Sequence, residues 1–145
     1  MTAGIRRGLI GAISGALILT TVAGGASDPA SADEKLYICA VKEARECTAS
    51  APCKKVELRD IFLSPLIVFD LENKVIVSAA MDDRGRKEKI VGTVRTGDEL
   101  IVYGHGDDEA WNTIISLKSG NMTGNINSGE ISHVLFGHCA PHKYP

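Results

Sequence analysis

The chain has 145 residues and a formal net charge of −2, with 16 basic and 18 acidic residues mixed along its length. This length is enough for one small domain. The chain has no basic stripe and no basic amphipathic helix, which argues against nucleic acid or a membrane surface as its partner.

The first 32 residues have the three parts of a cleavable signal peptide. Arg6 and Arg7 provide a basic start, an uncharged apolar run covers 9–23, and Ala-Ser-Ala at 30–32 is a cleavage site of the A-x-A type. A second possible cut follows Ala26. The apolar run is shorter than the roughly 20 residues of a membrane-spanning helix. We therefore expect cleavage, a protein free of the membrane, and a periplasmic or secreted location.

Cleavage leaves 33–145 as a single domain that contains all four cysteines. An even number of cysteines in a small exported domain predicts disulfide bonds. Cys39 and Cys139 lie near the two ends of the domain, whereas Cys47 and Cys53 flank a short loop. We favour the pairing Cys39–Cys139 with Cys47–Cys53, in which the first bond closes a long loop and strongly constrains the unfolded chain. The other connectivities stay open.

From Leu36 onward, short apolar runs alternate with turn residues, a pattern that predicts β strands and hairpins. About eight strands are expected, over 36–41, 66–69, 75–79, 90–94, 100–103, 111–117, 122–126 and 131–136. Loops are expected over 47–55 and 81–87, and 42–46 is the best helical candidate. The spacing predicts an all-β domain, a small meander barrel or sandwich, with Trp111 as a core anchor.

Sequence motifs of common enzyme classes are absent. The chain contains no G-x-S-x-G, H-E-x-x-H, P-loop or C-x-x-C sequence. The acidic clusters at 82–83 and 107–109 lack the alternating oxygen ligands of a calcium loop. We therefore expect a non-enzymatic domain that needs no cofactor.

Cys139-Ala140-Pro141-His142 resembles the copper loop of small cupredoxins such as pseudoazurin and amicyanin. The resemblance implies Cys139 and His142 as copper ligands, with His105 as the upstream histidine. A copper thiolate and a disulfide cannot share Cys139. We therefore rank the metal site below the disulfide and interpret His138 and His142 as surface or tail residues.

The mature region as a whole resembles small exported bacterial proteins of unknown function. The residues that carry this resemblance are Cys39, Cys47, Cys53, Ser116-Leu117-Lys118-Ser119-Gly120 and Phe136-Gly137-His138-Cys139. A fainter resemblance, to periplasmic β-barrel inhibitors of C-type lysozyme, rests on Tyr37-Ile38-Cys39 and the C-terminal cysteine. The leading hypothesis is an exported domain that binds an unidentified protein or small ligand. The alternatives are metal binding and enzyme inhibition.

Overall fold

The computed structural model describes residues 34–78 and 86–142. The expected signal segment, the last residue of the expected strand 75–79, the 81–85 part of the expected polar loop, and residues 33 and 143–145 of the expected domain lie outside it. The elements are β1 (Leu36–Thr48), β2 (Ala51–Val56), η1 (Leu58–Ile61), β3 (Leu66–Asp70), β4 (Val75–Ser78), β5 (Arg86–Thr96), β6 (Glu99–His105), β7 (Ala110–Ser116), β8 (Asn121–Ser128) and β9 (Ile131–Pro141). Within these described ranges, no helix has the length and apolar character needed to cross a membrane.

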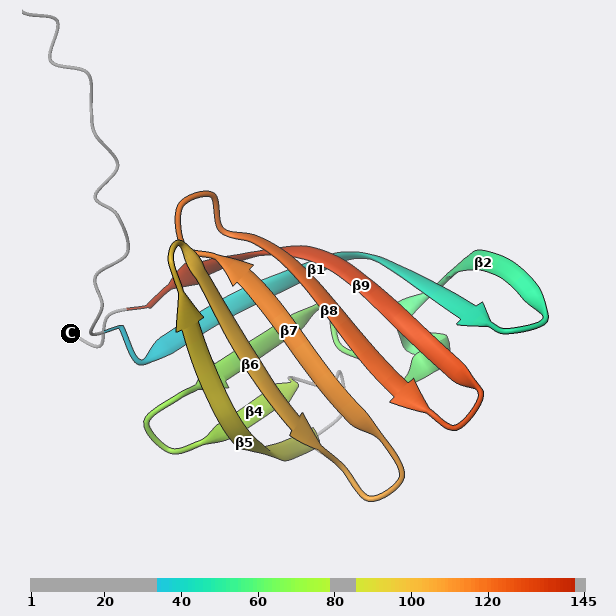
Figure 1. The fold of residues 1–145 in the computed structure, drawn as a ribbon, viewed down its shortest axis with the longest axis horizontal. Helices are drawn as coiled ribbons and strands as arrows, with labels where there is room; N and C mark the ends of the chain where they lie inside the picture. The colour runs from blue at the N-terminus through green and yellow to red at the C-terminus, as the bar shows by residue number, and fades with distance from the viewer. Residues whose placement is uncertain (1–33, 79–85, 143–145) are drawn as a thin grey trace, which may run out of the picture.

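Eight of the strands form a closed antiparallel barrel (Figure 1). The order is β1-β3-β4-β5-β6-β7-β8-β9, and β9 pairs back onto β1. The first half of β1 pairs with β3 and its second half with β2, which has no other partner among the strands of 34–78 and 86–142. The β1–β2 hairpin therefore extends beyond the barrel wall (Figure 1). The prediction of an all-β meander is confirmed, in its barrel form.

Alternate side chains along the strands fill the barrel, as the two-residue period of a strand requires. The fully buried ones include Tyr37, Phe69, Ile90, Val102 and Ile115. Trp111 is also buried, which confirms it as a core anchor, and its ring centroid lies 6.4 Å from that of Phe69. Its indole lies against Gly104, where a Cβ atom would overlap the ring. The absence of a side chain at 104 therefore makes room for the indole.

Both predicted disulfides are present. Cys39 and Cys139 are directly opposite one another on β1 and β9, and both are buried. Cys47 and Cys53 join the two strands of the β1–β2 hairpin. Two such bonds indicate an oxidising, non-cytoplasmic compartment.

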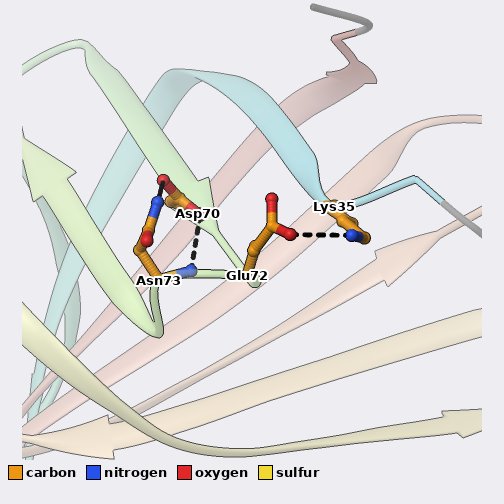
Figure 2. Close-up of polar contacts among 4 residues, drawn as sticks. All are labelled: Lys35, Asp70, Glu72 and Asn73. Carbon is orange, nitrogen blue, oxygen red and sulfur yellow. Dashed lines mark hydrogen bonds and ion pairs between the residues drawn. The ribbon is translucent and has the colours of Figure 1, made fainter.

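The β3–β4 turn is fixed by the side chain of Asp70 (Figure 2). Its carboxylate accepts hydrogen bonds from the Asn73 backbone N–H (2.9 Å) and side-chain amide (2.8 Å). These bonds hold the pKa of Asp70 below its ordinary value, because they stabilise the charged form. Beside them, Lys35 pairs with Glu72 at 2.7 Å and ties the start of the domain to this turn.

Three local expectations were wrong. Residues 42–46 belong to β1 rather than to a helix, because pairing with β9 and β2 overrides the weak propensity of so short a segment. The expected loop at 47–55 contains most of β2, and β9 runs on to Pro141. His138 therefore lies in a strand, and His142 directly follows it with its backbone N–H bonded to the Leu36 carbonyl (2.8 Å).

Candidate docking site around Phe62

The barrel interior offers little space for a ligand. In the described residues, a cavity of about 40 Å³ opens beside Trp111, lined mostly by apolar side chains such as Phe69, Met122 and Leu135. Pockets for drug-sized ligands occupy roughly 300 Å³ or more, whereas a water molecule needs only about 10–15 Å³. The cavity therefore has room for one or a few waters rather than for a small organic ligand.

The predicted copper ligands do not come together. Cys139 is bonded to Cys39, so it presents no thiolate. His105 ends β6, whereas Cys139 lies on β9, three strands away in the order β6-β7-β8-β9. The described residues contain no cluster of three His, Cys, Asp or Glu side chains suited to a metal ion. The donor set of a copper site is thus not assembled here.

His138 contributes to packing instead. Its imidazole covers Gly120, where a Cβ atom would lie 2.6 Å from Cε1. The backbone of Gly120 has a φ of +75° and its carbonyl accepts a hydrogen bond from the Cys139 N–H (2.7 Å). The imidazole of His138 therefore packs over the turn that precedes β8.

A polar cluster at the base of the hairpin joins β2, β1 and β9. Lys54 Nζ lies 2.8 Å from Glu46 Oε1, and His133 Nε2 lies 3.6 Å from Glu46 Oε2. The hydrogen bond from Lys54, assisted by the charges of Lys54 and His133, lowers the pKa of the Glu46 carboxyl. The cluster links the side chains of three residues that the strand ladders place next to one another. Sequence reasoning missed it because its members meet only through strand pairing.

Phe62, which follows η1, is the large hydrophobic side chain with the greatest exposure in the described residues, at 86%. Its φ and ψ of 53° and 32° lie in the left-handed region. That conformation costs an L-residue about 1–2 kcal/mol. A bulky residue keeps it only where the surrounding structure imposes it.

Hydrogen bonds on both sides impose this conformation. The N–H groups of Phe62 and Leu63 donate to the carbonyls of Arg59 (3.2 Å) and Leu58 (2.9 Å). Just downstream, the N–H of Ser64 donates to the Ser78 hydroxyl at 3.2 Å, and both serines are buried. The turn is therefore joined to the end of β4 as well as to its own helix.

The flanking apolar side chains point the other way. Leu58, Ile61 and Leu63 pack against the barrel core, so Phe62 is the only apolar side chain of this turn directed into solvent. Next to it, Arg59 and Asp60 are highly exposed and lie 3.6 Å apart, from Nε to Oδ1. The turn thus presents a phenyl ring beside one basic and one acidic group.

Sequence reasoning did not single out Phe62. In the run Ile61-Phe62-Leu63, three apolar residues are adjacent, and no Gly or Asn marks the position with positive φ. Comparison with known proteins gives no further guide, since no family model, curated protein or solved structure matches the chain. The candidate site therefore depends on its geometry alone.

Proposed function

We propose that this protein is a non-enzymatic, exported β-barrel domain that binds a partner protein through Phe62. The exposed phenyl ring, on a turn fixed in a left-handed conformation, is the observation that carries the proposal. Aromatic side chains are frequent anchors of protein interfaces. A turn already fixed before binding loses little conformational entropy when it binds. The signal-like segment and the two disulfides support export to the periplasm or the medium.

The partner that fits this turn has an apolar pocket for the phenyl ring and a polar rim. Arg59 and Asp60 carry opposite charges, so the rim on the partner should offer both an acidic and a basic group. Truncation of a central aromatic anchor costs about 2 kcal/mol or more, which is roughly a 30-fold loss of affinity.

Photo-crosslinking in the native host tests the proposal. We would place p-benzoylphenylalanine at position 62 of the exported protein, and at position 91 as a control. Val91 is also an exposed apolar residue but lies on β5. We expect a discrete crosslinked protein from position 62 that is absent from position 91.

The affinity for the crosslinked protein should then fall by about 30-fold or more in Phe62→Ala. Val91→Ala should change it by less than about twofold. No crosslink at position 62, or equal binding by the Phe62→Ala variant, would refute the proposed site.

Enzyme inhibition is a narrower form of the same proposal. A single aromatic residue on a fixed, projecting turn has a shape suited to enter an enzyme cleft, and protease inhibitors show that such complexes form with little movement. The lysozyme-type hypothesis predicts slower lysis of peptidoglycan by C-type lysozyme with wild-type protein, and normal lysis with Phe62→Ala. Unchanged lysis in both cases would end this form of the proposal and leave protein binding in place.

A further inference from the structure

Charge is distributed very unevenly around the barrel. Strands β7, β8 and β9 contain no Asp, Glu, Lys or Arg, and β6 contains only Glu99 at its start. The two charged residues between β7 and β9, Lys118 and Glu130, lie in turns. By contrast, five of the 11 residues of β5 are charged. Strands β6 to β9 lie side by side and form one continuous wall of the barrel (Figure 1).

Apolar side chains cross the outside of this wall in one row. Strand pairing places five residues directly next to one another, in the order Val94, Ile101, Ile114, Thr123 and Phe136. Val94, Ile114 and Phe136 are 48%, 38% and 40% exposed. We call the outer surface of β6–β9 together with Val94 the neutral face.

We propose that the neutral face is the interface of a symmetric homodimer. In a two-fold interface the same surface meets itself, so a charged residue near the axis faces its own like charge. Like charges placed together in an interface cost several kcal/mol. Interfaces between different proteins, in contrast, commonly use complementary charges for recognition. A wall free of Asp, Glu, Lys and Arg in three adjacent strands therefore fits a second copy of this chain better than a different partner.

The row is also self-complementary. If the axis passes through Ile114, the order of the row is reversed in the partner, so that Ile114 meets its own copy. Phe136 then faces Val94, a large side chain against a small one, and Thr123 faces Ile101. Every contact along the row pairs side chains without charge.

The size of the wall predicts a weak dimer. Four strands about 4.8 Å apart and roughly seven residues long cover about 20 by 23 Å, or roughly 450 Å² per chain. Two such faces bury about 900 Å² or somewhat more, once side-chain relief is included, at the low end of specific interfaces. We expect a dissociation constant in the micromolar range, roughly 1–100 μM.

Sedimentation equilibrium of the mature, disulfide-bonded protein over about 1 μM to 1 mM tests this. The wild type should pass from monomer to dimer within that range. Ile114→Lys should raise the dissociation constant by about 100-fold or more. Leu66→Lys is the matched control, because Leu66 is 47% exposed but lies on β3, outside the neutral face. It should leave the constant unchanged.

Two variants with opposite charges at position 114 test whether the two-fold axis passes through Ile114. Ile114→Lys and Ile114→Glu should each be monomeric, whereas an equimolar mixture should form a heterodimer with Lys and Glu across the axis. Thr123→Lys provides a second monomeric variant if either of these fails to give a wild-type unfolding curve. A wild type that stays monomeric at 1 mM, full dimerisation of these variants, or a mixture that stays monomeric would overturn the proposal.

Discussion

The two disulfides should contribute very differently to stability. Cys39 and Cys139 are 100 residues apart in the sequence, whereas Cys47 and Cys53 are only six apart. In the chain-entropy model, a closed loop of 100 residues stabilises a protein by about 4.7 kcal/mol and a loop of six by about 2 kcal/mol. The first pair also lies in the core, so its removal by Cys39→Ala and Cys139→Ala adds the cost of a cavity.

Urea unfolding at neutral pH measures both values. We expect a loss of about 5 kcal/mol or more for the Cys39–Cys139 double alanine variant, against about 2 kcal/mol for the Cys47–Cys53 variant. A small domain has only about 5–15 kcal/mol in total, so the first variant should be close to unfolded. If the hairpin variant were the less stable of the two, loop length would not be the main source of stabilisation, and the reasoning would fail.

Four further substitutions test three other features. Phe62→Ala should lower the free energy of unfolding by less than about 1 kcal/mol because the ring is exposed, whereas Phe69→Ala in the core should lower it by about 3–5 kcal/mol. Equal losses for the two variants in chemical denaturation would contradict the exposed position of Phe62. Gly104→Ala should cost about 1–3 kcal/mol because the new Cβ would overlap the Trp111 ring and the Lys89 carbonyl oxygen, and tryptophan fluorescence should change. A neutral effect would mean that both neighbours can move. Burial raises the pKa of Tyr37, so wild type should lose stability as the pH rises above 10.0, the ordinary pKa of tyrosine. Tyr37→Phe should lose less stability over that pH range in urea titrations, and parallel pH curves would count against a buried phenol.

Much of the fold could be predicted from two kinds of signal in the sequence, the turn residues between apolar runs and the positions of the cysteines. The turn at Gly97 has a positive φ of 56°, as a glycine between two apolar runs predicts. The pairing of Cys39 with Cys139 was predicted because the two residues are near opposite ends of one domain, and in the barrel the first and last strands are neighbours. The expected strands from 66 to 136 all occur, with ends that shift by a few residues.

The remainder depends on pairing between distant segments. Residues 42–46 consist of helix-forming residue types, and only the ladders with β9 and β2 make them part of a strand. The direction of Phe62 is set by bonds to Leu58 and by packing of its two neighbours, none of which a sequence pattern reveals. The row across the neutral face likewise exists only through the register of five strands, although the lack of charge in 110–117 and 121–129 is visible in the sequence.

The closure of the barrel has a consequence for aggregation. Open strand edges are the places where one chain can add to another and begin a fibril. Among the strands that the structure describes, β2 is the one with a single partner. Its six residues include Pro52, which has no N–H to donate, together with Lys54 and Lys55, whose charges repel a second copy of the same edge. The oxidising compartment that the two disulfides indicate lies outside the reach of cytoplasmic chaperones. The residues that oppose uncontrolled addition of strands therefore lie on one short edge strand, β2.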